Sequence, residues 1–198
     1  MKMKKNIMIV GVGGQGTLLA SKILGRAAMD SGLDVKVSEV HGMSQRGGSV
    51  VPYVRVGDEV YSPVIGRGDA DVILSFEILE AARWLPHLKP GGTIVTSTQE
   101  INPMPVITGA AEYPEGLADD MKALGVDVRA YDAPAIAAAA GSARASNVAL
   151  IGLAADVLGF DLAVLRDAVA ACVPQKALEV NLRAFDAAIA RAAENKNA

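Results

Sequence analysis

The first forty residues carry two hydrophobic patterns that predict a strand, a helix and a second strand. Residues 6–10 form a short apolar run ended by a glycine, which is typical of a buried parallel strand. In residues 17–31 apolar side chains repeat every four positions opposite a charged stripe, which predicts an amphipathic helix. Residues 34–40 predict the next strand, so the stretch is interpreted as one right-handed βαβ unit.

The middle of the chain continues the sheet. A Gly57-Asp58 pair between two apolar runs is a strong hairpin signal. Residues 102–108 are interrupted by proline, which predicts an edge strand or a loop. Strands are predicted at residues 50–56, 59–65, 71–76, 92–97 and 127–131, and helices at residues 77–85 and 116–124.

After residue 133 the pattern becomes alanine-rich and helical, with no further strand signal. Residues 147–158 are apolar on nearly all sides, which predicts a helix buried in the protein or covered by a partner. Asp161 is a plausible N-cap for a helix that ends near Val173. The last predicted helix carries an apolar seam whose members are Leu178, Leu182, Phe185 and Ile189.

Together these elements predict one α/β domain over residues 1–198. Its core is a Rossmann-like, mostly parallel sheet over residues 6–132 with flanking helices and a hairpin insertion, followed by a helical region over residues 133–192. Length and composition fit this, since 51% of the 198 residues are apolar.

Charge and residue inventory exclude several function classes. The net charge is −3 and no basic stripe is present, which argues against nucleic acid as a partner. No apolar stretch reaches the length of about 20 residues that a membrane span needs, and the apolar run after the basic N-terminus is too short for a signal peptide. We therefore expect a cytoplasmic protein. One cysteine, Cys172, and two distant histidines predict no disulfide, metal site or cluster of the chain's own.

The first candidate site is the glycine-rich turn after the first strand. It fits the GxGxxG pattern between a strand and a helix, where backbone N–H groups and the helix dipole favour an anion. Glu39 lies 23 residues after the last glycine, near where a ribose-binding acid lies in NAD sites. NAD itself is disfavoured because Glu39 runs directly into an irregular loop. The alternative is that the glycines only permit tight packing. The turn consists of Gly11, Val12, Gly13, Gly14, Gln15 and Gly16.

The second candidate site is the loop at residues 41–49, which follows the second predicted strand at the expected ligand-binding edge of the sheet. Arg46 offers a planar fork for a carboxylate or phosphate, and His41 can titrate near neutral pH. A solvated surface loop is the alternative. The remaining candidates in this loop are Ser44, Gln45, Gly47 and Gly48. Elsewhere, Cys172 is expected in the core and His87 in solvent, while Glu77 and Glu80 are explained by a helix N-terminus.

Taken together, the motifs resemble one family. The order GVGGQG, HGMSQRGGS, YSPVIG, NVALIG and NLRAF is similar to the gamma-type domain of thiamine-dependent 2-oxoacid:ferredoxin oxidoreductases, over residues 6 to about 190. The HGMSQRGG motif is most similar to the corresponding segment of the small (beta) subunits of the indolepyruvate ferredoxin oxidoreductases. The resemblance adds Asn147, which begins NVALIG, to the candidate site residues.

The resemblance implies an activity that this chain cannot perform alone. Such enzymes oxidatively decarboxylate a 2-oxoacid, transfer the acyl group to coenzyme A and pass electrons through [4Fe-4S] clusters to ferredoxin. The GDG…Asn pattern of the family's thiamine diphosphate and Mg²⁺ site is missing here, as are cluster cysteines. A larger partner in a hetero-oligomer is therefore expected to carry these groups. This chain would help to shape the pocket for the 2-oxoacid carboxylate or a coenzyme A phosphate.

One alternative stays open at this point. The chain can also be interpreted as a stand-alone NAD(P)- or nucleotide-binding Rossmann protein, although such an oxidoreductase needs a second, substrate-binding domain. Within the resemblance, aryl pyruvates are the expected substrates, while pyruvate, 2-oxoglutarate and branched-chain 2-oxoacids remain open.

Overall fold

The computed structural model describes residues 4–40 and 48–196. Within them, six strands form one mixed sheet in the order β2-β3-β1-β4-β5-β6, and only β3 runs antiparallel to its neighbours. This confirms the predicted mostly parallel α/β sheet. The strands are β1 (Lys5–Val12), β2 (Asp34–Val40), β3 (Ser49–Gly57), β4 (Ala70–Ser75), β5 (Leu88–Ser97) and β6 (Asp127–Tyr131).

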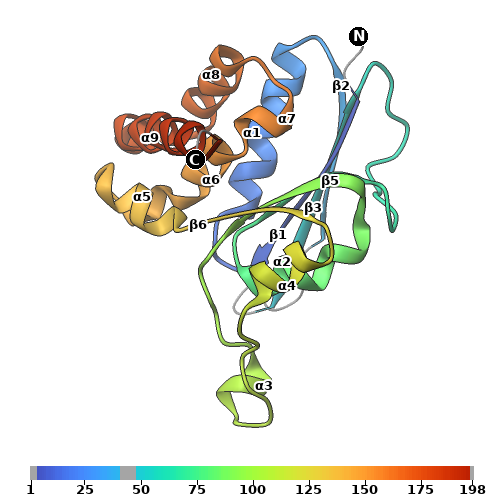
Figure 1. Ribbon diagram of the computed structural model, residues 1–198. Helices are drawn as coiled ribbons and strands as arrows, with labels where there is room; N and C mark the ends of the chain where they lie inside the picture. The colour runs from blue at the N-terminus through green and yellow to red at the C-terminus, as the bar shows by residue number, and fades with distance from the viewer. Residues whose placement is uncertain (1–3, 41–47, 197–198) are drawn as a thin grey trace.

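Helices cover both faces of this sheet (Figure 1). The alternation of side chains along β1 shows why both faces need covering, because Ile7 and Ile9 point to one face and Met8 and Val10 to the other. The first face packs against α1 (Thr17–Asp30) and the C-terminal helices. The second packs against α2 (Ile78–Trp84) and α4 (Leu117–Ala123).

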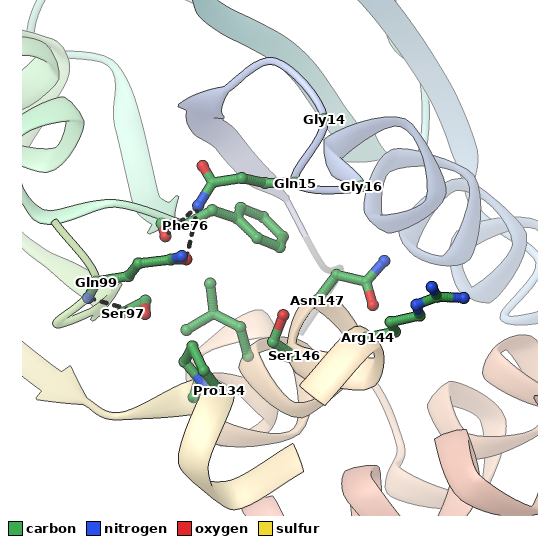
Figure 2. A pocket seen from close by; sticks show the side chains of 12 residues that line it. Gly14, Gln15, Gly16, Phe76, Ser97, Gln99, Pro134, Arg144, Ser146 and Asn147 are labelled. Atoms are coloured by element: carbon green, nitrogen blue, oxygen red, sulfur yellow. Dashed lines mark hydrogen bonds between the residues drawn. The ribbon is translucent and has the colours of Figure 1, made fainter. Parts of the chain in front are cut away.

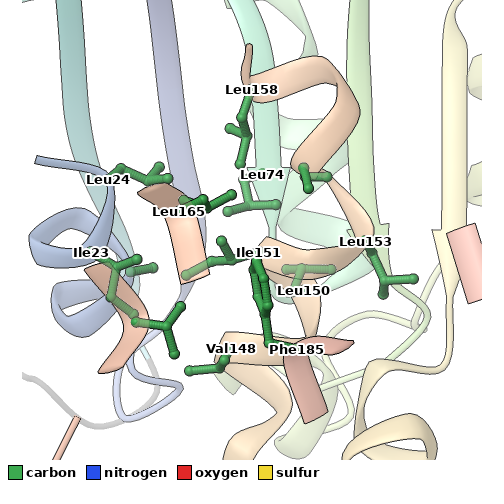
Figure 3. Packing of buried hydrophobic residues seen from close by; sticks show 14 of the residues in the cluster. Ile23, Leu24, Leu74, Val148, Leu150, Ile151, Leu153, Leu158, Leu165 and Phe185 are labelled. Carbon is green, nitrogen blue, oxygen red and sulfur yellow. The ribbon is translucent and has the colours of Figure 1, made fainter. Parts of the chain in front are cut away.

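The C-terminal region is helical, as predicted. Its central helix, α6, contributes Val148, Leu150, Ile151 and Leu153 to the core, all fully buried within this chain (Figure 3). The predicted 147–158 helix is thus buried by its own protein, and it breaks at Ala154 into two helices. The elements are α5 (Ala133–Ala139), α6 (Ser146–Leu153), α7 (Ala155–Leu158), α8 (Leu162–Cys172) and α9 (Leu178–Lys196), with short 3-10 turns η2 (Ala143–Ala145) and η3 (Gln175–Ala177) between them.

The predicted hairpin at Gly57-Asp58 is wrong, and so is the predicted strand at residues 59–65. The antiparallel hairpin is formed by β2 and β3 instead. Both edges of β3 are already paired, one with β2 and one with β1, so no edge is left for a partner that follows it. The Arg55 side chain holds the following segment in place by donating to the carbonyls of Ser62 and Val64, each at 3.1 Å.

Two further expectations need correction. Because β3 lies between β1 and β2, the first strand–helix–strand unit is split rather than made of adjacent strands. Residues 102–108 hold a short helix, α3 (Met104–Ile107), where an edge strand or a loop was predicted, since proline is tolerated in a first helical turn. This helix lies on an arm that projects from the body of the protein (Figure 1). A 3-10 turn, η1 (Leu85–His87), joins α2 to β5.

None of the helices in the described part of the chain combines the length and the apolar character that crossing a membrane requires.

Candidate functional site

A cleft of about 450 Å³ opens at the carboxyl ends of β1, β4 and β5 (Figure 2). This is the edge at which open α/β sheets bind ligands. The cleft joins the glycine turn to the helical region, whose first lining residue, Ala133, lies 117 positions after Gly16. Its lining residues are Gly14, Gln15, Gly16, Phe76, Ser97, Gln99, Ala133, Pro134, Arg144, Ser146, Asn147 and Leu150.

Different physical constraints require glycine at different positions of the turn. Gly16 has a φ of +85°, and a Cβ built on it would lie 2.4 Å from the Asn147 amide nitrogen. Gly14 has a φ of +99° and open space around it, so only its backbone conformation requires glycine. A Cβ on Gly11 would lie 2.8 Å from the Gln15 amide oxygen. The turn therefore approaches its neighbours as closely as the sequence pattern predicts.

The Gln15 side chain connects the ends of three strands. Its Oε1 accepts from the N–H of Val12 at 2.7 Å, and its Nε2 donates to the Phe76 carbonyl at 2.9 Å and to Gln99 Oε1 at 3.0 Å (Figure 2). These bonds engage both polar atoms of the Gln15 amide. Gln15 thus fixes the shape of the cleft edge.

The backbone N–H groups of the turn are only partly available to a ligand. Gly13 donates its N–H to the Gly48 carbonyl at 3.0 Å, so this amide is committed to the protein itself. Gly16 is the N-cap of α1, and no side chain caps this helix. The N–H of Leu19 bonds to the Gly16 carbonyl at 3.1 Å, so the amides of Thr17 and Leu18 are the ones left to solvent or to a ligand, as expected for an anion site.

The helical region adds polar groups to the other side of the cleft. Asn147 is only 8% exposed, and its side chain extends from α6 toward the glycine turn (Figure 2). Its Oδ1 accepts from the N–H of Val148 at 2.9 Å, while its Nδ2 lies beside Gly16. Arg144 is exposed and is the only charged residue among the described residues that line the cleft.

Sequence reasoning reached this group of residues only in part. Asn147 was reached through family resemblance alone, and Arg144, Ser146 and Gln99 were missed. No local pattern marks these residues, because tertiary packing alone brings η2 and α6 against the glycine turn.

The second candidate loop lies mostly outside the described residues. The candidate residues that lie outside the described part of the chain are His41, Ser44, Gln45, Arg46 and Gly47. The backbone of Glu39 belongs to β2, but its side chain is not described. The described end of the loop, Gly48, is bonded to the glycine turn through Gly13. The two candidate segments thus meet, as their positions after β1 and β2 predict.

The start of β3 is anchored on α2. The Ser49 hydroxyl donates to the buried Glu80 carboxylate at 2.5 Å, and the Trp84 indole N–H lies 3.3 Å from the same hydroxyl oxygen. Arg83 lies 3.6 Å from Glu80 and supplies a partly exposed positive charge. Glu80 therefore has a structural role at the edge of the candidate site.

Glu77 holds a second junction beside the cleft. It is 1% exposed, caps α2 through the N–H of Glu80 at 2.8 Å, and accepts from the N–H of Ile101 at 3.1 Å. The Tyr113 hydroxyl donates to the same carboxylate. Burial and the adjacent Glu77 carboxylate raise the pKa of Tyr113. The helix-cap interpretation is confirmed, and Glu77 in addition ties the α3 arm to the body of the protein.

His87 and Cys172, which the sequence does not favour as site residues, are both partly buried. His87 is half-buried, in contrast to the solvated position predicted, and its ring lies 5.0 Å from that of Trp84. Burial lowers the pKa of His87. Cys172 is partly buried, and burial raises the pKa of its thiol, which disfavours the reactive thiolate. Across the described residues, no group of three or more His, Cys, Asp and Glu side chains could hold a metal ion.

Comparison with known proteins places this fold and cleft in a family. The family model described as pyruvate ferredoxin/flavodoxin oxidoreductase matches residues 6–191. The chain belongs to this family. The match spans both sides of the cleft, the glycine turn as well as the helical region.

Named relatives of this oxidoreductase family match along the whole chain. "Indolepyruvate oxidoreductase subunit IorB" of Thermococcus kodakarensis is 44% identical over 196 residues, with 96% of each chain covered. The IorB subunit of Pyrococcus horikoshii is also 44% identical, covering 97% of this chain and 98% of its own. The gamma subunit of a keto/oxoacid ferredoxin oxidoreductase from Geobacter sulfurreducens has the same fold, with a TM-score of 0.72 at 22% identity, covering 96% of this chain and 99% of its own.

Proposed function

We propose that this chain is the small, non-thiamine-binding subunit of a 2-oxoacid:ferredoxin oxidoreductase of the indolepyruvate class. The observation that carries the proposal is the 44% identity to IorB subunits over 96% of each chain. Family membership leaves the stand-alone NAD(P)-binding alternative without support.

The proposal divides the chemistry between two subunits. Oxidative decarboxylation of a 2-oxoacid to an acyl-coenzyme A releases two electrons, which clusters pass to ferredoxin. A cluster needs several thiolates, whereas this chain has one cysteine, the partly buried Cys172. The larger subunit would therefore hold thiamine diphosphate, Mg²⁺ and the [4Fe-4S] clusters, and ferredoxin would be reduced through the assembled complex.

This chain would complete the active site with the cleft at the carboxyl ends of its strands. In the proposal, the α1 amides and Arg46 hold the carboxylate of the 2-oxoacid or a phosphate of coenzyme A. The bond between Gly13 and Gly48 supports this, because it keeps the described end of the Arg46 loop on the glycine turn. An arginine fork and a helix N-terminus favour the same ligands, which are anions.

The assembly claim is tested by co-expression with a candidate large subunit, a thiamine-binding, cysteine-rich chain to be sought among the neighbouring genes. Co-purification in a fixed ratio, with 2-oxoacid-dependent ferredoxin reduction only in the mixture, is the expected result. A chain that stays alone and binds NADH or ADP would instead support a nucleotide-binding protein and overturn the proposal.

The role of Arg46 is tested in the assembled complex. Arg46→Ala should raise the KM for the 2-oxoacid or for coenzyme A about 10- to 100-fold, the loss expected for one charged hydrogen bond. Arg67→Ala is the matched control, because Arg67 is exposed and precedes β4 at the opposite edge of the sheet. Unchanged KM values for both substrates in Arg46→Ala would refute the assignment.

A further inference from the structure

The helical side of the cleft presents polar groups that the described residues leave unsatisfied. The Asn147 Nδ2 donates to no acceptor among these residues, although the side chain is more than nine-tenths buried and lines the cleft. The Nδ2 atom itself is open to the cleft, so water can bond to it until a ligand takes its place. The Asn147 amide is therefore placed to donate to a molecule in the cleft.

The charge carried by the described lining of the cleft is positive. The Arg144 side chain makes no ion pair or hydrogen bond with the described residues, and none of the described residues that line the cleft is a carboxylate. α1 begins at the cleft and no side chain caps it, whereas α6 continues directly from η2. Because a helix N-terminus carries partial positive charge, the start of α1 and Arg144 together favour an anion.

The position of Arg144 is set by its backbone. The Ser142 hydroxyl oxygen accepts from the N–H of Arg144 at 3.3 Å and so caps η2. η2 runs directly into α6, and Ala145 between them is buried. Arg144 and Asn147 are therefore carried by one fixed piece of backbone, with the long arginine side chain free to close on a ligand.

The cleft also has apolar lining on both sides. Phe76 comes from the end of β4, and Leu150 and Pro134 come from the helical region; Phe76 and Leu150 are largely buried. A ligand that fills the whole cleft therefore needs an apolar body next to its anionic end.

We propose that Arg144 and Asn147 form an anion-binding subsite with the N-terminus of α1, which takes the carboxylate or phosphate of a ligand that also has an apolar or aromatic body. The inference deepens the proposed function and rests on it for the identity of the ligand. An aryl 2-oxoacid and a nucleoside phosphate both have this chemistry. Gly16 is part of the subsite, because any Cβ there would displace the Asn147 amide.

Calorimetric titration of the full chain at low ionic strength tests the subsite with three probes, namely inorganic phosphate, ADP and phenylpyruvate. At least one organic probe should bind the wild type, with affinity that falls as salt is added. Arg144→Ala and Asn147→Ala should each weaken that binding, about 10- to 100-fold for the arginine. Arg67→Ala removes the same charge at the opposite edge and should leave binding unchanged. Circular dichroism and thermal melting check that each variant is folded.

The outcome separates this inference from the proposed function. Binding of ADP that depends on Arg144 identifies a nucleoside phosphate as the ligand, and binding of phenylpyruvate identifies an aryl 2-oxoacid. The subsite is overturned if no probe binds the wild type at 10 mM, or if Arg144→Ala and Arg67→Ala bind alike. Assembly with the large subunit is measured on the same samples, and only a failure to assemble counts against the proposed function.

Discussion

Glu77→Ala is expected to destabilise the protein by about 3–5 kcal/mol, because three groups lose their acceptor at once. Loss of the α2 N-cap costs about 1 kcal/mol. The N–H of Ile101 and the hydroxyl of Tyr113 lose a buried carboxylate, at about 1–2 kcal/mol each. For a chain of this length the melting temperature should fall by roughly 6–20 °C.

The assay is thermal and urea unfolding of the variant beside a matched control. Glu112→Ala removes an exposed carboxylate from the same arm, one residue from Tyr113, and should change stability by less than about 0.5 kcal/mol. A double-mutant cycle with Tyr113→Phe should give a coupling energy of about 0.5–3 kcal/mol, since the two side chains are in contact. The reasoning is refuted if Glu77→Ala is no less stable than Glu112→Ala.

The same contact has a consequence for pH. The pKa of Tyr113 is raised by burial and by Glu77, so the folded state keeps this proton above the pH at which the unfolded chain releases it. The stabilisation is complete below about pH 10, the usual tyrosine pKa, and is lost as pH rises above it. Tyr113→Phe should flatten the alkaline limb of stability against pH. An unchanged alkaline limb in that variant would show that Tyr113 does not contribute.

Two further variants test the packing of the helical region. Gly152→Ala should destabilise the protein by about 1–3 kcal/mol, because the new Cβ would lie 2.7 Å from the Phe185 carbonyl oxygen and 2.9 Å from the Ala188 Cβ. Unfolding curves that match those of the wild type would contradict the close approach of α6 and α9. Asp161→Ala should cost about 1 kcal/mol in urea unfolding, because Asp161 caps α8 by accepting from two backbone amides, and Asp161→Asn should restore most of this stability.

Local sequence patterns determined the elements whose structure depends on neighbouring residues. β1, the glycine turn and α1 lie where the apolar run, the glycines and the four-residue repeat predict them. β6 and the N-cap of α8 at Asp161 were also predicted correctly, because the sequence signals for a strand and for a helix N-cap both depend on residues only a few positions apart. The prediction of an anion at the α1 N-terminus rests on the same local geometry.

Only the tertiary structure decided features that depend on distant residues. The Gly57-Asp58 pair has a hairpin sequence, yet β3 already has a partner on each edge, so the next segment cannot pair with it. Glu77 has the sequence of a surface helix cap, but the fold buries it against the α3 arm. Arg144 shows no pattern at all, because its position at the cleft depends on the packing of η2 and α6 beside a turn 130 residues earlier. The sequence therefore determines one wall of the candidate site, and the packing of the helical region on the sheet supplies the other.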